Sequence, residues 1–161
     1  MSDFPLVSII VASYNHERYV LKMLESVLAD DYANKELIIV NDGSKDNSHE
    51  VITQWISEHK DALPITYKFR ENKGVCRTLN ELIDLSQGKY LLPLPSDDIL
   101  IPGTITGRVK FLQEHPKKML LITDSLVIDE NDKEIMKSSI IDYNSGDKAK
   151  FINDDAILLS T

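Results

Sequence analysis

The sequence predicts an α/β fold in which a mostly parallel central sheet carries helices on both faces. Continuous apolar runs rich in β-branched residues, such as LVSIIVA at 6–12, are typical of strands buried on both faces. Between these runs lie segments whose apolar residues recur every three or four positions, as in amphipathic helices. Strands that alternate with helices in this way build mostly parallel sheets.

In the first half of the chain, strands are expected at 6–12, 36–40 and 65–69. A helix over about 16–29 follows the first strand, and a second helix follows the polar turn 41–48. Asn47 and Glu50 have the three-residue spacing of a capping box at the start of this second helix. The apolar stripes of the two helices are Val20, Leu24, Val27 and Leu28 in the first, and Val51, Ile52, Trp55 and Ile56 in the second.

In the second half, Gly74 opens a third helix, and Gly88 stands where a C-terminal cap is expected. Pro102 is typical of the first position of a fourth helix, which should end before Pro116. Strands are expected at 89–94 and 119–123, and a hairpin around 129–132. The stripes of these helices are Val75, Leu79, Leu82 and Ile83 in the third, and Ile105, Val109 and Leu112 in the fourth.

The bulk composition favours one globular domain, 1–161, and disfavours nucleic acid as a partner. The 161 residues are 42% hydrophobic and 27% charged, and the net charge of −8 lacks the basic excess that phosphate backbones require. Cys76 is the only cysteine, which suits a reducing, cytoplasmic compartment. We see no signal peptide and no apolar run long enough to span a membrane.

Polar clusters follow three of the predicted strands. Ligands of open α/β sheets bind beyond the carboxyl ends of the strands, so these clusters should share one edge. This shared location carries more weight than any cluster alone. The clusters are Ser13, Tyr14 and Asn15 after the first strand, Asn41, Asp42, Gly43 and Ser44 after the second, and Ser96, Asp97 and Asp98 after the fourth.

The adjacent carboxylates Asp97 and Asp98 suggest a site for a divalent cation and a diphosphate. Like charges repel unless a cation or donors compensate them, and Mg²⁺ and Mn²⁺ favour carboxylate and phosphate oxygens. The alternative is a solvated turn before the next helix. Asp42 either accepts a hydrogen bond from a nucleobase or serves ordinary turn chemistry. Tyr14 either packs against a base or belongs to a simple helix start.

Several other site types are disfavoured by missing motifs. No GxGxxG follows the first strand, and the chain has no GxxxxGK[ST] and no GxSxG. The four histidines lack zinc-ligand spacing. His16 lies near the proposed edge, and we interpret it as a surface residue.

Three stretches, in this order, resemble the family 2 glycosyltransferases of the GT-A fold, a Rossmann-like architecture. They are VSIIVASYNHERYV, ELIIVNDGSKDNS and ENKGVCRTLNELIDLSQGKYLLPLPSDDIL. The resemblance implies a nucleotide-sugar-binding region at about 5–125. The start of an acceptor-side region would follow at about 126–161, with the remainder missing.

The resemblance also implies roles for individual residues. Asp42 matches the acid that contacts the base, usually uracil, and Ala12, Ser13 and Tyr14 match the turn that lines the nucleotide pocket. Asp97 matches the last acid of an Asp-x-Asp motif that binds Mn²⁺ or Mg²⁺, with Asp98 beside the donor sugar and diphosphate. The remaining positions expected near the donor are Asn15, Gly43, Arg70, Arg77 and Ser96.

The chain departs from the family pattern at three places. Pro95 stands where the first acid of Asp-x-Asp is expected, and Asn41 replaces an acid in the turn before Gly43. The family's acceptor-binding half, with its catalytic base, normally follows about where this chain stops. Asp154 and Asp155 lie in the wrong context for that base, and we interpret them as loop residues or a helix start.

The resemblance therefore implies an inverting, metal-dependent transfer of a sugar, with UDP-sugar the preferred donor, onto a saccharide, lipid or protein acceptor. Peripheral membrane association through the missing parts stays open, as does the oligomeric state. We expect this fragment to bind donor without transferring it. The alternatives are a non-catalytic nucleotide-sugar-binding domain, a sugar nucleotidyltransferase, or an α/β interaction module.

Overall fold

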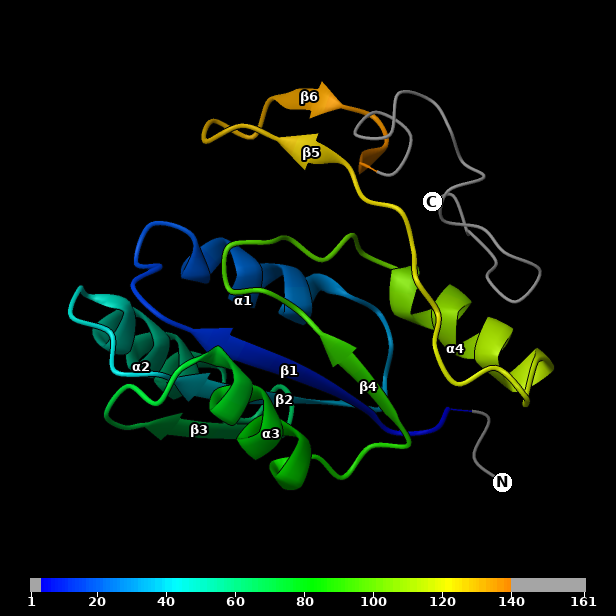
Figure 1. Ribbon diagram of the computed structural model, residues 1–161, viewed down its shortest axis with the longest axis horizontal. Helices are drawn as coiled ribbons and strands as arrows, with labels where there is room; N and C mark the ends of the chain where they lie inside the picture. Colours follow the sequence, from blue (N-terminus) through cyan, green and yellow to red (C-terminus); the bar gives the residue numbers. More distant parts are fainter. Residues whose placement is uncertain (1–3, 140–161) are drawn as a thin grey trace. The chain divides into compact units, whose positions relative to one another are not determined.

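The computed structural model describes residues 4–139 (Figure 1), which belong to two compact units whose boundary in the sequence lies between Val109 and Lys110. The predicted α/β class is confirmed. The strands are β1 Val7–Ser13, β2 Lys35–Asn41, β3 Ile65–Phe69, β4 Tyr90–Pro93, β5 Val127–Ile128 and β6 Glu134–Met136. The helices are α1 Val20–Ala29, α2 Ser48–His59, α3 Val75–Leu85 and α4 Thr104–Glu114.

The central sheet of the first unit is wholly parallel, with the order β3-β2-β1-β4. Ser13 pairs with Asn41, and Asn41 with Phe69, so three strands end level with one another. The chain runs from β1 outward through β2 to β3 and then returns to the other side of β1 as β4. The carboxyl ends of β1 and β4 therefore flank the point where the strand order reverses, which is where ligands of such sheets bind.

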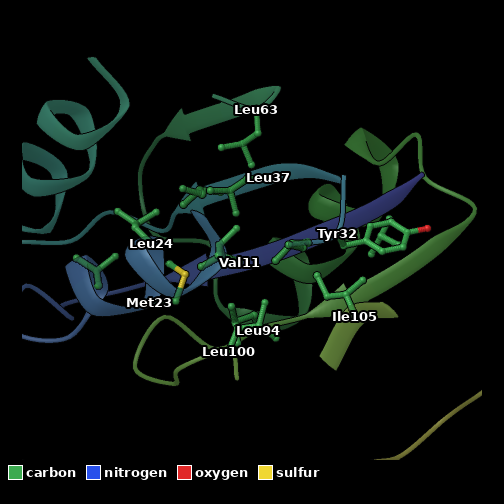
Figure 2. Close-up of a cluster of buried hydrophobic side chains, with 14 of the residues drawn as sticks. Val11, Met23, Leu24, Tyr32, Leu37, Leu63, Leu94, Leu100 and Ile105 are labelled. Carbon is green, nitrogen blue, oxygen red and sulfur yellow. The ribbon is translucent and has the colours of Figure 1, made fainter. Parts of the chain in front are cut away.

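Helices cover both faces of this sheet, as predicted. The strand residues Val7, Ile9, Val11, Leu37 and Ile39 pack with α1, α2 and the start of α4 in the larger core (Figure 2). The alternate positions Ile10, Ile38 and Val40 pack against Leu82 of α3. Every residue of β2 is buried, which explains the unbroken apolar run in its sequence.

The sequence predicted that the first helix begins at about His16. In the structure it begins at Val20. The backbone N–H groups of Asn15, His16 and Glu17 donate to side chains of the 41–48 turn instead. These hydrogen bonds hold the segment as a loop, and the local periodicity carries no sign of such distant partners.

Asn47 is the N-cap residue of α2, as predicted, but the capping box is wrong, and so is the cap predicted at Gly88. Asn47 makes no capping side-chain hydrogen bond; Asp46 accepts from the N–H and the hydroxyl of Ser48 instead. Gly88 lies beyond the C-cap of α3, which is Ser86. A Cβ at Gly88 would lie 2.5 Å from the Ser8 hydroxyl, so this glycine allows close approach to β1.

The predicted stripe of α3 is only partly buried. Leu82 and Thr78 are fully covered, whereas Val75, Leu79 and Ile83 are 63%, 36% and 49% exposed. This helix contacts the sheet through β1 and β2. Its buried face is therefore narrower than the apolar stripe in its sequence.

In the second unit, the predicted hairpin is confirmed by the antiparallel pair β5 and β6. The strand predicted at 119–123 is wrong, because within residues 4–139 this segment shows only an isolated bridge at Thr123, and Met119 and Leu120 are 98% and 75% exposed. Pairing depends on a partner that an apolar run cannot specify. Asp154 and Asp155 lie outside the described residues. No helix within residues 4–139 has the length and apolar character needed to cross a membrane.

Candidate donor site at the carboxyl edge of the sheet

The loop after β1 is bonded to the turn after β2. Asn15 adopts a left-handed backbone conformation with φ of 56°, which asparagine tolerates better than most residues. Its N–H donates to the Ser44 hydroxyl at 3.0 Å, and its side-chain oxygen accepts from the Lys45 N–H at 2.8 Å. The first two polar clusters therefore meet, as the strand ends predict.

A reciprocal pair of hydrogen bonds strengthens this connection. The Glu17 N–H donates to Asp46 at 3.0 Å, and the Asn47 N–H donates to Glu17 at 2.7 Å. Burial would raise the pKa of Asp46, but its hydrogen bonds to Ser48 and to the Glu17 N–H hold it below the usual value. The carboxylates of Asp46 and Glu17 thus accept hydrogen bonds from backbone N–H groups and hold the two loops together.

Asn41 and Ser13 are buried where β2 and β1 end. The Asn41 side chain accepts from the Ser44 N–H at 2.9 Å and donates to the Tyr67 hydroxyl at 3.4 Å. An amide supplies both functions, which suits asparagine here. The Ser13 carbonyl accepts from the Asp42 N–H at 2.8 Å, while its hydroxyl has no hydrogen-bond partner among the described residues.

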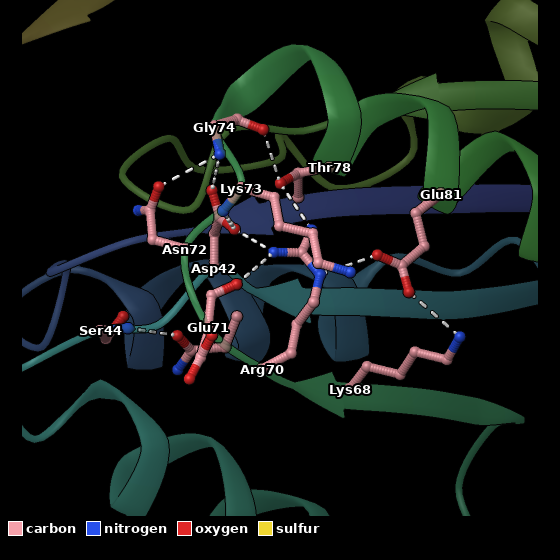
Figure 3. Close-up of polar contacts among 11 residues, drawn as sticks. Asp42, Ser44, Lys68, Arg70, Glu71, Asn72, Lys73, Gly74, Thr78 and Glu81 are labelled. Atoms are coloured by element: carbon pink, nitrogen blue, oxygen red, sulfur yellow. Dashed lines mark hydrogen bonds and ion pairs between the residues drawn. The ribbon is translucent and has the colours of Figure 1, made fainter.

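Asp42 holds the loop after β3 against the end of β2 (Figure 3). One carboxylate oxygen accepts from the Lys73 N–H at 2.8 Å and from the Arg70 guanidinium, and the other accepts from the Gly74 N–H at 3.0 Å. Burial alone would raise the pKa of Asp42, but these hydrogen bonds and the Arg70 charge keep it below the usual value. Asp42 is 5% exposed, and its carboxylate accepts hydrogen bonds mainly from groups of the protein itself.

Arg70 completes this clamp. Its guanidinium also donates to Glu81 at 2.8 Å, to the Thr78 hydroxyl at 2.9 Å and to the Glu71 carbonyl at 2.9 Å. Arg70 therefore ties β3 to α3 as well as to Asp42, a fixed role that its sequence position did not indicate. A contact between Arg70 and a nucleotide stays a prediction.

Gly43 permits the close approach of this loop. Its φ is +77°, and a Cβ would lie 2.7 Å from the Asn72 nitrogen and 3.1 Å from the Arg70 carbonyl oxygen. Both atoms belong to the backbone and cannot rotate away. A side chain at this position would push the Arg70–Gly74 segment off Asp42.

The acidic residues follow β4 at the point where the strand order reverses. Ser96 is 1% exposed, and its hydroxyl lies 2.7 Å from His16 Nδ1. The same nitrogen lies 3.7 Å from an Asp97 oxygen. The third cluster thus meets the first, and all three polar clusters share one edge.

The Asp97–Asp98 pair suits a cation that also binds an anionic ligand. Burial, followed by the neighbouring charge of Asp97, raises the pKa of Asp98. A divalent ion would relieve this repulsion with hard oxygen ligands. Residues 4–139 contain no group of three or more histidine, cysteine or acidic side chains arranged to hold a metal. These residues therefore fit a metal site in which the protein would supply one or two carboxylates and a substrate would supply further ligands.

The remaining predicted residues differ in exposure. Ala12 is partly buried at the end of β1, whereas Tyr14 is 42% exposed and its ring is available to a ligand. Arg77 is exposed in the first turn of α3 and forms no ion pair or hydrogen bond with the described residues. Its approach to a nucleotide stays a prediction.

His16 is the residue at this edge that the sequence interpretation missed. Its side chain is 32% exposed and bonded to the Pro95–Asp98 loop after β4, called the acidic loop below, so the assignment as a plain surface residue is wrong. Four scattered histidines gave no local signal. The position directly after Tyr14 and Asn15, at the end of a predicted strand, was the available hint.

In sequence, the chain is similar to known glycosyltransferases. The model of glycosyl transferase family 2 matches residues 8–156. EpsE of Bacillus subtilis strain 168, provisionally named a glycosyltransferase, is 31% identical over 130 residues, which cover 81% of this chain and 46% of EpsE. An uncharacterized glycosyltransferase of Haemophilus influenzae is 31% identical over 147 residues, covering 91% of this chain and 44% of that protein.

Solved structures show the same fold. TarS of S. aureus, residues 1–349, in complex with UDP-GlcNAc, has a TM-score of 0.66 at 26% identity over 75% of this chain and 35% of that structure. The mannosyltransferase PcManGT of Pyrobaculum calidifontis, in complex with GDP-Man and Mn²⁺, has a TM-score of 0.67 at 24% identity, covering 81% and 38%. The chain spans less than half the length of each of these four proteins.

Proposed function

Because this chain belongs to glycosyl transferase family 2, we propose that it forms the donor-binding part of an enzyme that transfers a sugar from a nucleoside diphosphate. The acceptor is a hydroxyl group, and the transfer inverts the anomeric carbon. The observation that carries the proposal is the contact of Ser96 and Asp97 with the loop after β1, which is itself bonded to the loop after β2.

In this proposal Asp97 is the direct ligand of Mn²⁺ or Mg²⁺, and Asp98 assists it. The half-exposed Asp97 carboxylate, at 49%, is accessible to a hydrated ion. When bound, the ion neutralises negative charge on the leaving nucleoside diphosphate. Pro95 offers no carboxylate, so a bound ion would need its further ligands from phosphate oxygens and water.

We place the nucleobase of the donor between the loops after β1, β2 and β3. Tyr14 offers an exposed ring for stacking, and the acceptor that we assign to the nucleobase is the Asp42 oxygen that also accepts from the Gly74 N–H. An imide N–H of uracil suits that acceptor. The TarS complex with UDP, at 26% identity, supports uridine as the preferred nucleoside.

The proton of the attacking hydroxyl needs a general base, which we propose lies in a part of the protein beyond these 161 residues. Asp42, Asp46 and Glu17 accept hydrogen bonds from the protein, and Asp97 and Asp98 are assigned to the cation. We therefore expect these 161 residues to bind donor with little transfer. Robust sugar transfer by this chain alone would contradict that part of the proposal.

A non-catalytic nucleotide-sugar-binding domain is the second candidate, and Pro95 is the observation that favours it. A sugar nucleotidyltransferase has less support, because the segment from Ser13, the last residue of β1, to Arg18 contains no glycine. Transfer by the full-length protein, tested with UDP-sugars and mixed saccharide acceptors, separates the first two functions.

A thermal-shift panel of UDP, GDP and dTDP, each with Mn²⁺ or with EDTA, tests donor binding. A nucleotide at 100 times its dissociation constant stabilises the fold by about 2.7 kcal/mol, or about 5–11 °C for a domain of this size. We expect the largest shift for UDP with Mn²⁺.

The matched variants are Asp97→Asn at the site and Asp61→Asn, which removes the same charge from an exposed residue after α2. Asp97→Asn should abolish the metal-dependent part of the shift, and Asp61→Asn should keep it. If no nucleotide raises the melting temperature with metal present, the proposed function is wrong.

A further inference from the structure

His16 connects the two loops that flank the point where the strand order reverses. It belongs to the loop after β1, and its imidazole reaches the loop after β4, Pro95–Asp98. Nδ1 lies 2.7 Å from the buried Ser96 hydroxyl and 3.7 Å from Asp97. No other side chain among the described residues joins these two loops by a hydrogen bond or an ion pair.

The backbone of His16 is itself fixed. Its N–H donates to the Ser48 hydroxyl at 3.0 Å, and its carbonyl accepts from the N–H groups of Tyr19 and Val20 at 3.0 and 2.9 Å. Ser48 is fully buried and held by Asp46. The Tyr19 ring meets the imidazole edge-on, with centroids 6.1 Å apart. Groups outside the acidic loop therefore fix the position and orientation of the imidazole.

The acidic loop has few attachments of its own. The Asp98 N–H donates to the Pro95 carbonyl at 3.1 Å, which closes a turn within the loop. Ser96 is almost fully buried, and His16 is the hydrogen-bond partner of its hydroxyl. Without the imidazole, this hydroxyl loses that partner in a place that water barely reaches, which favours rearrangement of the loop.

We propose that His16 is a positioning residue that holds the Pro95–Asp98 loop, through Ser96, so that Asp97 faces the metal-bound diphosphate. The consequence for binding rests on the proposed function. Groups that orient metal ligands typically change metal affinity by about 10–100-fold when they are removed. Because Pro95 supplies no second acid, the orientation of Asp97 carries more of the metal affinity here.

Nucleotide binding by calorimetry tests this role with His16→Ala, Ser96→Ala and the double variant. His16→Ala should weaken UDP binding about 10-fold or more with saturating Mn²⁺ and leave binding in EDTA unchanged. Ser96→Ala should do the same, and the double variant should add little, because both changes break one interaction. His16→Asn places an amide near the position of Nδ1 and should restore binding.

The control is His59→Ala, at the far end of α2, where the ring packs against Trp55. This variant should bind UDP as the parent chain does. The proposal is overturned if His16→Ala binds normally, if the loss is equal with and without metal, or if His16→Asn folds and fails to restore binding.

A second measurement needs no nucleotide. Amide hydrogen exchange of Asp98 should accelerate at least about 10-fold in His16→Ala, with exchange in β1 and β2 unchanged. Unchanged exchange at Asp98 overturns the positioning role. If the parent chain binds no nucleotide while exchange still accelerates, the donor-site proposal fails and the positioning role stands.

Discussion

Replacement of Gly43 by alanine should be costly for two separable reasons. The positive φ of +77° costs an alanine about 1–2 kcal/mol. The new Cβ would lie 2.7 Å from the Asn72 nitrogen and 3.1 Å from the Arg70 carbonyl oxygen. Moving packed backbone to relieve such contacts costs about 1–3 kcal/mol more. We expect a total loss of about 2–5 kcal/mol in the free energy of unfolding.

Gly103→Ala is the matched control. Gly103 has nearly the same φ, +81°, but nothing lies within 4 Å of its added Cβ. Its N–H donates to Asp30, and alanine keeps that donor. Gly103→Ala should therefore lose only the backbone term, about 1–2 kcal/mol.

Urea unfolding followed by circular dichroism measures both variants. Gly43→Ala should also weaken nucleotide binding, because the Arg70–Gly74 segment moves away from Asp42, whereas Gly103→Ala should not. Equal losses of stability in the two variants would refute the argument that close packing at Gly43 fixes this loop.

Three further predictions concern the same unit. Arg70→Lys keeps the charge but loses the planar donors to Thr78 and Glu81, so unfolding should become easier by about 1–3 kcal/mol in urea. Folding lowers the pKa of Asp42. The carboxylate therefore contributes its full stabilisation at pH values above the usual pKa of 3.8, and this contribution is lost as the pH falls through the pKa of the folded state. Urea midpoints from pH 6 to pH 3 should thus fall less steeply in Asp42→Asn, and parallel curves would contradict this. Leu82→Ala, in the core, should cost about 2–5 kcal/mol, whereas Leu79→Ala, 36% exposed, should cost under about 1 kcal/mol by the same measurement.

Local pattern predicted most of the first unit because burial and periodicity agree there. The fully buried β2 appears in the sequence as ELIIV, and the bounds of Ile65–Phe69 match the expected strand. The segment 119–123 has the same apolar character, but within residues 4–139 it forms no strand and shows only an isolated bridge at Thr123. Composition records the tendency to be buried and does not name the partner.

The site divides in the same way. The ends of predicted strands located all three polar clusters, because the carboxyl ends of parallel strands share an edge. The bonds among these clusters were not predictable, since they join residues about 30 to 80 positions apart. The roles of His16 and Arg70 depend on such bonds.

The hydrogen bonds around Asp42 also determine how this site can be altered. A substitution at Asp42 would change the acceptor that we propose for the nucleobase and would release the Lys73–Gly74 backbone at the same time. A screen for lost activity would collect misfolded chains alongside chains with altered recognition. Tyr14 is exposed, and no hydrogen bond joins its side chain to residues 4–139. Attempts to change nucleobase preference should therefore start at Tyr14 and leave Asp42 in place.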